Sequence, residues 1–485
     1  MTSPAENRRT QPEPLSAEDV QILNLESAII AGHTLKIMAL EAPPGTKPPA
    51  TDQVRALVAE RLAAVPRLLQ HLTFDKEWPE WTLDEDFDLG YHVRSASVDG
   101  PLDDSALESF AAREMRARLD RKRPLWMLHV LTSPGENRWA LLWKLHHCMA
   151  DGSTAMWWGS RLLWDSSASD ASPHAPGAGR GASGAPGPVS EAASASSGRT
   201  RRAGRFASWR EAAAVCAGLP GTLRRELRPL AHPSPLCRPA GVRRQVAFAS
   251  FGLEELRTLG KAVDPGVTVN DTLLALLAGA IRVWLGAEGH RGAHIRVQVP
   301  VCMHPPSREL DPRANSDSFF FVDLPVLKED TVQQLVSICK QTSDRKNHHD
   351  AQNLYAVFEV LSRFSKPLYR WASQLTTSPR EYSLNVSNVP GPRGPAFVLG
   401  SRMRAMYSLA EISQRHGLRA TAVSLSGSLF IGLCADPDAV PRLELLIEGL
   451  KRSYAQLKDG AGRRPSGGAR THPGSEMAGP SRDTP

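Results

Sequence analysis

The sequence contains few cysteines, and none of them forms a recognisable pattern. Six are spread over 485 residues, with no C-x-x-C pair and no dense framework. A small secreted domain stapled by disulfides is therefore not expected, and free thiols in a reducing cytoplasm are the simplest account. The six are Cys148, Cys216, Cys237, Cys302, Cys339 and Cys434.

Long apolar runs are also missing. The segment from Met1 to Arg9 lacks the apolar core that a signal peptide needs. The longest apolar helix that the sequence predicts covers residues 272–285, is too short to span a bilayer and contains Arg282. We therefore expect any association with a membrane to be peripheral.

The charge is moderately basic and diffuse. The formal net charge is +7, the isoelectric point is about 9.2, and part of the basic excess lies in the tails. Such a charge favours anionic partners, such as phosphorylated small molecules or acidic lipid surfaces. Because no nucleic-acid-binding motif accompanies it, we expect no nucleic-acid partner.

The length and a change in composition predict two domains. Between them the chain turns to Ser, Ala, Gly and Pro with hardly a large apolar side chain, as in a flexible linker. The predicted division is a disordered leader over 1–13, a first domain over 14–165, a linker over 166–200, a basic segment over 201–240, a second domain over 241–458 and a disordered tail over 459–485.

The basic segment alternates cations with aromatic side chains. Arg201, Arg202 and Arg205 stand beside Phe206 and Trp209. This pattern is typical of a helix that lies on an anionic lipid surface. A basic helix packed on the protein body has the same composition, so both interpretations stay open.

One short stretch organises the first half. An apolar run over residues 138–145 predicts a buried strand, and residues 153–164 predict a helix. Between them stand His146, His147, Asp151 and Gly152. A histidine fixed where a strand ends, yet open to a cleft, suits a general base. We expect Asp151 to hold the turn and Gly152 to adopt a backbone conformation that other residues resist.

Two other interpretations of the histidine pair stay open. One is a structural pair, and the other is half of a metal site. Metal is the weaker alternative, because adjacent histidines on a strand point to opposite faces and no Cys/His cluster is near. A second pair, His348 and His349 before Asp350, lies in a polar segment and predicts a solvated helix face or loop.

The pattern H-H-x-x-x-D-G resembles the motif of CoA-dependent acyltransferases, which include chloramphenicol acetyltransferase and peptide-synthetase condensation domains. Together with four further phrases in the same order, it resembles the bacterial wax ester synthase and acyl-CoA:diacylglycerol acyltransferase family. The five phrases are F-D-L-x-x-H-V-R at 87–94, L-D-R-K-R-P-L-W at 119–126, H-H-C-M-A-D-G at 146–152, V-N-D-T at 269–272 and S-N-V-P-G-P at 387–392.

Two places depart from that family's pattern. Met127 stands where family members commonly have Glu after the Trp, which weakens any role carried over for an acidic group. In the phrase that usually reads P-V-S-M-R, Cys302 replaces Ser and His304 replaces Arg.

The resemblance implies a fold and a site. The fold is α/β (α+β), with two chloramphenicol-acetyltransferase-like domains and the active site in a channel between them. His147 is implied as the base, with His146 positioning the turn, and Asp151 as structural. No metal or redox cofactor is implied, and acyl-CoA is the co-substrate. Cys148 as a nucleophile is a minor alternative, because the strand pleat turns it away from His147.

The other phrases imply substrate contacts, each with a structural alternative. Pro124 to Trp126 predict a wall packed beside the histidine strand. Asn270 or Thr268 is expected to cap a helix, with Asp271 complementing its dipole. A turn is predicted where Pro390 fixes φ and Gly391 accepts positive φ. The implied substrate-binding residues are Pro124, Leu125, Trp126, Asn270, Asp271, Asn388, Pro390 and Gly391.

The resemblance implies transfer of a long-chain acyl group to diacylglycerol, and also to long-chain alcohols. The implied location is the cytoplasm, at the inner face of the plasma membrane, another membrane or a lipid-droplet surface. One alternative is an acyltransferase acting on a non-lipid or carrier-bound acceptor, because the motif is shared across the superfamily. An inert lipid-binding relative is disfavoured, because His147, Asp151 and Gly152 are all present.

Overall fold

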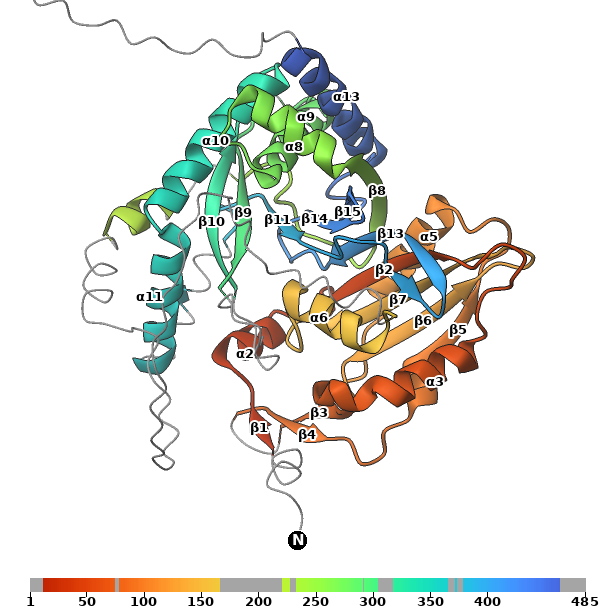
Figure 1. Cartoon of the computed structure of the whole chain (residues 1–485). Coiled ribbons are helices and arrows are strands. Elements are labelled where there is room, and N and C mark those ends of the chain that lie inside the picture. Colours follow the sequence, from red (N-terminus) through yellow and green to blue (C-terminus); the bar gives the residue numbers. More distant parts are fainter. Residues whose placement is uncertain are drawn as a thin grey trace, which may run out of the picture.

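The computed structural model describes residues 12–74, 78–165, 220–226, 233–290, 292–303, 317–364, 371–372 and 378–462. Two six-stranded sheets, each flanked by helices, form the two halves of the molecule (Figure 1). The expected linker over 166–200 and most of the basic segment and tails lie outside the described residues.

The first sheet carries the histidine motif and has the order β12-β13-β2-β7-β6-β5. The two strands at one edge of this sheet, β12 and β13, come from the second half of the chain, and β13 pairs antiparallel with β2. The expected domain division at residue 241 would instead have placed β12 and β13 in the second domain. The strands are β2 (His33–Glu41), β5 (Val93–Ser97), β6 (Trp126–Thr132), β7 (Arg138–His146), β12 (Phe397–Val398) and β13 (Ser401–Ala410).

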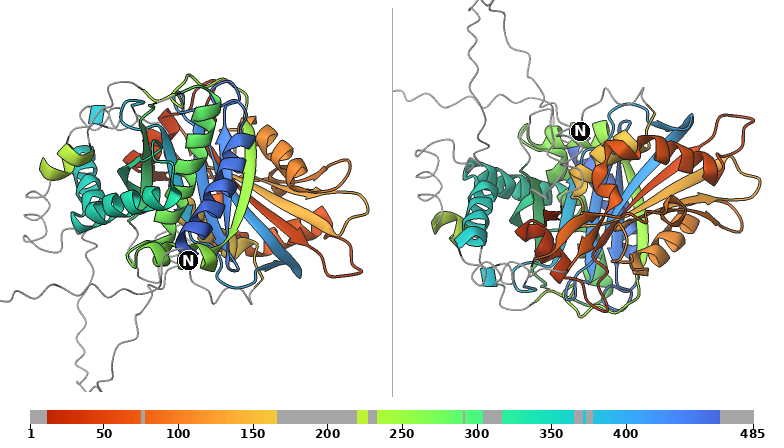
Figure 2. Two further views of the ribbon diagram at one scale, coloured as in Figure 1. Left: turned by 90° about the horizontal axis from the view of Figure 1, so that it is seen from above. Right: turned by 90° about the horizontal axis from the view of Figure 1, so that it is seen from below.

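Helices cover both faces of this sheet (Figure 2). Lys144 of β7 donates to the Glu114 carboxylate of α5 (Asp104–Arg116) at 2.8 Å. Trp143, its neighbour on the strand, lies against Gly159 of α6 (Gly152–Leu162). Because successive side chains of a strand point to opposite faces, α5 and α6 lie on opposite sides of the sheet. Helix α3 (Thr51–Arg61) packs beside α6.

The second sheet has the order β10-β9-β11-β14-β15-β8. Its strands are β8 (Gln245–Gly252), β9 (Ile295–Cys302), β10 (Asp317–Leu324), β11 (Leu384–Val389), β14 (Leu418–Leu425) and β15 (Ser428–Ala435). The sequence predicts a hairpin of residues 422–428 and 430–434 with Gly427 at its turn. This hairpin is confirmed, since Ser426 and Gly427 turn between β14 and β15 with φ of 48° and 85°. Its helices are α8 (Leu253–Val263), α9 (Val269–Ala287), α10 (Thr331–Asn347), α11 (Asp350–Phe364) and α13 (Glu444–Gly462).

Helix α9 is longer than predicted. It has 19 residues, because Thr268 caps it and the helix continues to Ala287. By length and composition it is the one helix among the described residues that is long and apolar enough to cross a membrane, yet 72% of its most apolar stretch is buried. Gly449 of α13 approaches Ala280 so closely that an added Cβ would lie 2.5 Å from the Ala280 Cα. Helix α9 therefore serves as a core helix in this fold.

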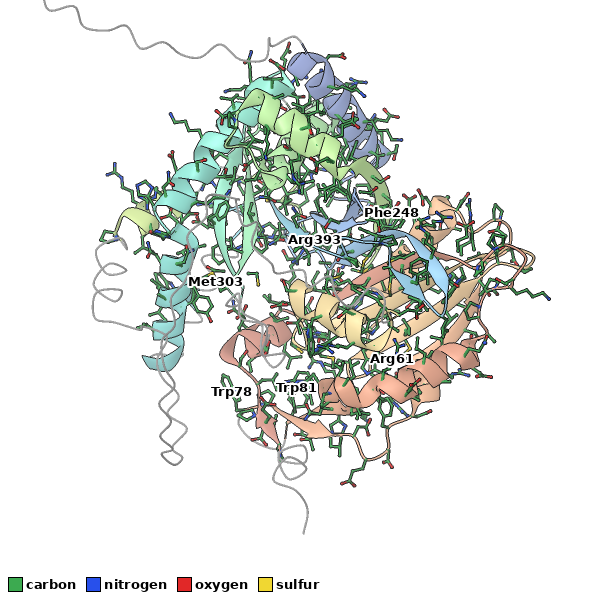
Figure 3. All side chains as sticks on the ribbon, viewed as in Figure 1. Arg61, Trp78, Trp81, Phe248, Met303 and Arg393 are labelled. Atoms are coloured by element: carbon green, nitrogen blue, oxygen red, sulfur yellow. The ribbon has the colours of Figure 1, made fainter. Side chains whose placement is uncertain are left out.

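A small third sheet belongs to the first half of the molecule. Its order is β1-β4-β3, formed by Glu13–Pro14, Glu80–Leu83 and Gln70–Thr73. The Trp78 indole, labelled in Figure 3, donates to the Leu15 carbonyl at 2.8 Å. The sequence predicts a helix start here with Ser16 as the N-cap. Helix α2 (Ala17–Asn24) follows as expected, and Ser16 caps it by accepting from the Asp19 backbone at 3.0 Å. This arrangement fixes where the next segment, residues 26–33, enters the first sheet.

The predicted solvated position of His348 and His349 is confirmed, because both are exposed in the turn between α10 and α11, but Asp350, which follows them, is buried. The Asp350 carboxylate is fully buried and accepts hydrogen bonds from Thr222 at 2.7 Å and from Arg225 Nε at 2.9 Å. A cation and a hydroxyl from a distant helical turn supply partners that the local sequence does not reveal. Residues 220–226, one of the two described parts of the basic segment, are therefore packed on the protein body, whereas residues 201–210 lie outside the described residues.

The C-terminal helix differs in its bounds from what the sequence predicts. Apolar residues at helical spacing predict a helix over 440–457, whereas the helix runs over Glu444–Gly462 and extends into the expected tail. Its buried residues include Leu450, Leu457 and Ala461, and this apolar side explains the added turn.

Candidate active site

The histidine motif forms the turn between β7 and α6. Asp151 is almost fully buried, and its Oδ1 accepts a hydrogen bond from the Thr154 backbone at 2.7 Å, which makes it the N-cap of α6. An N-cap carboxylate satisfies backbone donors that the helix leaves unpaired. Asp151 therefore orders the start of the helix that follows the histidines.

His147 lines an internal cavity and is half-buried. Its backbone N–H donates to the Gly32 carbonyl at 2.9 Å, which fixes the residue. Burial, followed by the nearby Arg419 charge, lowers the pKa of His147 to about 4, although Asp151 and its own backbone act in the opposite direction. The ring is therefore neutral near pH 7. With Nδ1 buried, Nε2 is the nitrogen that can reach a substrate.

His146 faces away from this cavity and is held on both sides. Its Nε2 lies 2.7 Å from Glu26 Oε1, and its Nδ1 lies 2.9 Å from the Cys148 sulfur. Glu26 in turn pairs with Arg121 at 2.9 Å. Burial raises the pKa of Glu26, but His146 and Arg121 outweigh it, so that this pKa lies below its ordinary value. His146 thus positions the turn through a buried carboxylate.

The Cys148 thiol shares this buried environment. Burial raises its pKa well above the ordinary value, so the group stays a neutral thiol that faces His146. A nucleophilic cysteine needs a thiolate within reach of the substrate. The geometry offers no such thiolate here.

Three glycines allow the close approaches that build the site. Gly32 has φ of 71°, and a Cβ there would lie 2.6 Å from His146 Nε2. Gly152 is not in the positive-φ region that we expected, but a Cβ there would lie 2.7 Å from Val389 of β11. Gly391 likewise lacks positive φ, and its Cβ would meet the Ser424 carbonyl at 2.2 Å. Close packing therefore explains why glycine is needed at positions 152 and 391. Both of these close contacts lie near the end of β11.

The cavity has a volume of about 450 Å³ and is lined from both halves of the molecule. On the second sheet, a polar row crosses three neighbouring strands at one level: Gln298 of β9, Asn385 of β11 and Arg419 of β14. The Asn385 amide donates to Gln298 Oε1 at 3.0 Å. His147 therefore faces a polar wall supplied by the other half.

The residues around Trp126 pack beside β7, the strand that leads to the two histidines. The Trp126 ring is fully buried, donates to the Leu68 carbonyl at 2.8 Å and stacks on His92 with ring centres 4.5 Å apart. The Leu125 carbonyl accepts from the His146 backbone at 2.9 Å. Neither these residues nor Pro124 line the cavity, so their direct contact with a substrate stays a prediction.

The N-D phrase begins α9 rather than lining the cavity. Thr268 is the N-cap, and the Asp271 carboxylate accepts from the Thr268 backbone at 2.8 Å and from the Thr342 hydroxyl at 2.6 Å. Asn270 lies in the same first turn. Asn388 and Pro390 lie at the end of β11, beside the region that approaches Gly152. A substrate contact by any of them stays a prediction.

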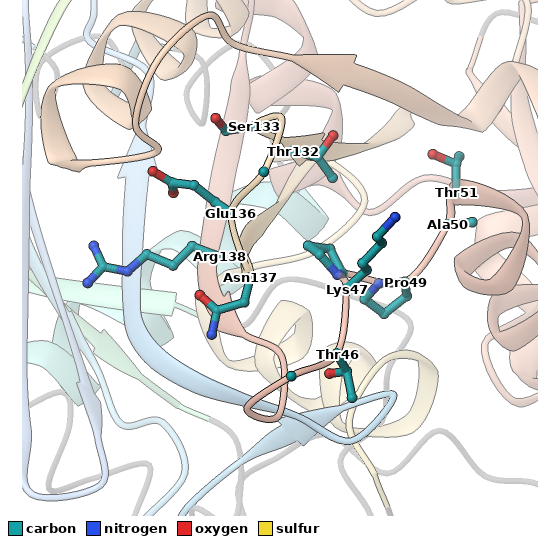
Figure 4. A pocket seen from close by; sticks show the side chains of 13 residues that line it. Thr46, Lys47, Pro49, Ala50, Thr51, Thr132, Ser133, Glu136, Asn137 and Arg138 are labelled. Carbon is teal, nitrogen blue, oxygen red and sulfur yellow. The ribbon is translucent and has the colours of Figure 1, made fainter.

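A second hollow, of about 920 Å³, lies far from the motif (Figure 4). It is formed by the loop before α3 and the turn between β6 and β7, and it includes Arg138. Arg138 begins β7 and His146 ends it. At about 3.4 Å per residue, the length of the strand separates this hollow from the histidines.

Sequence reasoning missed these residues of the site: Glu26, Gly32, His33, Gln298, Asn385 and Arg419. Glu26, Gly32 and His33 lie in a segment that joins a predicted helix to a predicted strand and matches none of the quoted phrases. Arg419 lies in a strand more than 250 residues after the motif. The only local signal is a glycine followed by a histidine at the start of a strand.

Comparisons with known proteins agree with this arrangement. The chain matches the wax ester synthase/diacylglycerol acyltransferase catalytic domain over residues 15–273, and the C-terminal domain of the same family over residues 314–458. Among similar proteins, a probable diacylglycerol O-acyltransferase of Mycobacterium tuberculosis H37Rv, tgs1, is 31% identical over 422 residues, which cover 84% of this chain and 89% of that protein. Another from that strain, tgs2, is 27% identical and covers 79% and 84%.

Solved structures show the same fold. The wax ester synthase/diacylglycerol acyltransferase from Marinobacter aquaeolei VT8 has a TM-score of 0.66 at 22% identity, and the match covers 93% of this chain and 100% of that chain. The first condensation domain of the calcium-dependent antibiotic synthetase has a TM-score of 0.59 at 15% identity, covering 94% and 97%.

The predicted resemblance is thus confirmed at the level of sequence and of fold. Both family domains are matched in order, and the histidine motif lies at a cavity that both halves line. The chain therefore belongs to the wax ester synthase/diacylglycerol acyltransferase family of O-acyltransferases.

Proposed function

We propose that this protein transfers a long-chain acyl group from acyl-CoA to the hydroxyl of diacylglycerol, and to long-chain alcohols as well. The observation that carries the proposal is a neutral His147 in a cavity lined by both halves, in a chain of this family. Its relatives in Mycobacterium tuberculosis bear the name diacylglycerol O-acyltransferase.

The proposed reaction uses His147 as a general base. Its Nε2 takes the proton from the acceptor hydroxyl while the oxygen attacks the thioester carbonyl. The tetrahedral intermediate then collapses, the carbon–sulfur bond breaks, and the departing CoA thiolate takes the proton from His147. The products are an ester and free CoA. No electron is gained or lost in these steps, so we propose no redox cofactor, and no step that we propose uses a metal.

Two carboxylates, those of Asp151 and Glu26, hold the turn that carries His147 and take no part in the reaction. Asp151 orders the start of α6, and Glu26 fixes His146, so the turn that carries His147 is held from two directions. Positioning of this kind raises the rate, because a displacement of the base by about 1 Å can lower the rate about 100-fold.

We further infer that the enzyme works at a lipid surface in the cytoplasm. Moving diacylglycerol through water would cost about 0.8 kcal/mol for each exposed methylene, so an enzyme that uses it benefits from meeting it at an interface. The basic segment with Arg201, Phe206 and Trp209 is the proposed contact, although it lies outside the described residues. The surface would be the inner face of the plasma membrane or a lipid body.

An assay of the purified protein tests the function directly. With palmitoyl-CoA as donor, we expect time-dependent formation of triacylglycerol from diolein and of wax ester from hexadecanol, each with release of one CoA thiol. Chromatography of the lipid products and a thiol reagent measure both products. If neither acceptor reacts while a small polar alcohol does, the alternative of a non-lipid acceptor is correct.

The pH dependence of the reaction reports on His147. Its pKa near 4 lies below the ordinary value of a histidine, so the base stays neutral and active while the pH falls through 6.5. We therefore expect kcat/KM to change less than about twofold between pH 8 and pH 5.5, and to fall only as the pH approaches 4. Initial rates with palmitoyl-CoA and diolein in a constant-ionic-strength buffer series measure this. A half-maximal point near pH 6.5 would show that the ring is solvated.

A further inference from the structure

The exposed residues among those that line the His147 cavity mark its mouth. Asn24 and Leu25 lie at the end of α2, and Gln414 and Arg415 lie in the loop between β13 and β14. His147 lines the same cavity but is half-buried, so it lies deeper. A substrate that enters at this mouth therefore passes between the end of α2 and the loop after β13.

The loop that carries Arg415 is a tight turn. The backbone N–H of His416 donates to the Ser413 carbonyl at 3.2 Å, which places Arg415 at the tip of the turn. The His416 ring stacks on Tyr382 of a neighbouring segment, with ring centres 4.1 Å apart. The fold therefore fixes the backbone from which the Arg415 side chain extends.

A second turn lies beside the first. The backbone N–H of Glu381 donates to the Ser378 carbonyl at 2.9 Å, and the exposed Arg380 lies within this turn. The second turn leads into β11 and the first into β14, and these two strands are parallel neighbours (Figure 1). Because parallel strands begin at the same edge of a sheet, Arg380 and Arg415 lie at one edge.

The charge at this mouth is positive. Glu411 is the only carboxylate among the described residues that line the cavity, and it pairs with Arg244 at 2.7 Å. Neither Arg415 nor Arg380 forms an ion pair or a side-chain hydrogen bond with any residue that the structure describes. A guanidinium group carries five N–H donors in a planar fork. Both groups can therefore bind an anion from solvent.

The polar row of the second sheet leads inward from the two turns. Asn385 of β11 and Arg419 of β14 are register partners a few residues after Arg380 and Arg415, and Gln298 accepts from Asn385 at 3.0 Å. The row lines the cavity that contains His147. From the mouth inward, the cavity thus offers cations first and amide groups next.

Acyl-CoA carries its functional groups in the matching order. Its thioester must lie at His147 if that residue is the base. The pantetheine arm beyond the sulfur carries two amides, and the far end carries a pyrophosphate and a ribose 3′-phosphate. Guanidinium groups bind phosphate through paired, charge-assisted hydrogen bonds. The hydrocarbon chains of the donor and the acceptor offer nothing to such cations.

We propose that the two turns at this mouth bind the phosphates of acyl-CoA, with Arg415 as the principal contact and Arg380 as the second. The pantetheine arm then runs along the polar row, and the thioester reaches His147. This inference rests on the proposed function, because it locates the donor of the same reaction.

The test compares two donors that differ only in the phosphorylated nucleotide end. Palmitoyl-CoA and S-palmitoylpantetheine are each supplied with diolein in neutral detergent micelles. With palmitoyl-CoA, we expect Arg415→Gln to lower kcat/KM about tenfold, through KM rather than kcat, as loss of one charge-assisted hydrogen bond remote from the reacting atoms predicts. Adding Arg380→Gln should lower it further. With S-palmitoylpantetheine, both variants should stay within about twofold of the wild type.

Arg452→Gln is the matched control. Arg452 is exposed on α13, does not line the cavity and removes the same charge when it is replaced. We expect wild-type kcat/KM with both donors, so an effect of net charge alone would be recognised. Thermal unfolding of every variant checks that it is folded.

Anionic lipid headgroups also carry phosphates, and a second measurement separates them from CoA. The wild type and Arg415→Gln are sedimented with phosphatidylcholine vesicles that contain or lack phosphatidylglycerol. We expect the two proteins to bind each kind of vesicle equally. Weaker binding of the variant to the anionic vesicles, together with unchanged kinetics for both donors, would assign the mouth to lipid headgroups and overturn the proposal.

Calorimetric titration with CoA alone tests the site without turnover. We expect the Kd for CoA to rise about tenfold in Arg415→Gln. Equal Kd values for the wild type and the double variant, or a similar kinetic loss with both donors, would refute the phosphate contact. If the wild type binds CoA through Arg415 yet transfers no acyl group to diolein or hexadecanol, the proposed function is wrong in its acceptor while this site stands.

Discussion

Replacing His147 by alanine is expected to lower kcat by about 10²–10⁴, the range that a positioned general base contributes. His146 is not placed to take over, because it is bound to Glu26 and Cys148 on both of its nitrogens. The fold should survive, because the His147 contact to Gly32 is made by its backbone and remains in the variant. Product formation from palmitoyl-CoA and diolein measures the loss, and circular dichroism checks the fold.

His146→Ala provides the comparison. It removes a positioning group rather than the base, so the fall in kcat should be smaller than for His147→Ala. It also leaves the buried Glu26 carboxylate without its histidine, which is expected to cost about 1–3 kcal/mol of folding free energy. Denaturant unfolding measures that cost. If His147→Ala kept most of the wild-type turnover, or if His146→Ala were the more damaging variant, the base would be wrongly assigned.

Gly32→Ala is expected to be the most damaging change outside the motif. The left-handed φ of 71° disfavours any side chain, and the new Cβ would lie 2.6 Å from His146 Nε2 and 3.0 Å from the Glu26 side chain. The pair of His146 and Glu26 must then separate, and the Gly32 carbonyl that holds the His147 backbone must shift. We expect a loss of about 100-fold or more in kcat, as a displacement of about 1 Å implies.

Gly45→Ala separates the effect of a side chain at a left-handed φ from the effect of the contact with His146. Gly45 has a similar φ of 79°, but an added Cβ there meets no atom within 4 Å. It should pay the conformational penalty of about 1 kcal/mol in stability and leave the rate unaffected. Steady-state kinetics and denaturant unfolding on both variants measure rate and stability separately. Equal rates for Gly32→Ala and Gly45→Ala would mean that the contact with His146 has no influence on the base.

The sequence predicted those features whose physical cause is local. The strand before the histidines and the helix after them follow from apolar spacing, and Ser16 caps its helix through a side chain three residues from its partner. The turn at Gly427 follows from the backbone freedom of one residue.

The glycines show where local reasoning reaches its limit. We expected Gly152 and Gly391 to be needed for unusual backbone angles, and neither has positive φ. Their requirement comes instead from Val389 and Ser424, which press against them from other strands. A one-dimensional pattern identifies a glycine but does not identify the neighbour that excludes a Cβ.

By itself, then, the sequence determined the family, the order of most helices and strands, and the residue expected to act as base, because these depend on contacts within a few positions or on whole phrases. The tertiary structure alone decided that β13 completes the sheet of the first half, that Glu26 holds His146, and that His147 and Arg419 line one cavity. Each of these brings together residues that lie more than 100 positions apart in the chain. Such pairs are selected by the packing of the two sheets, and no local periodicity encodes that packing.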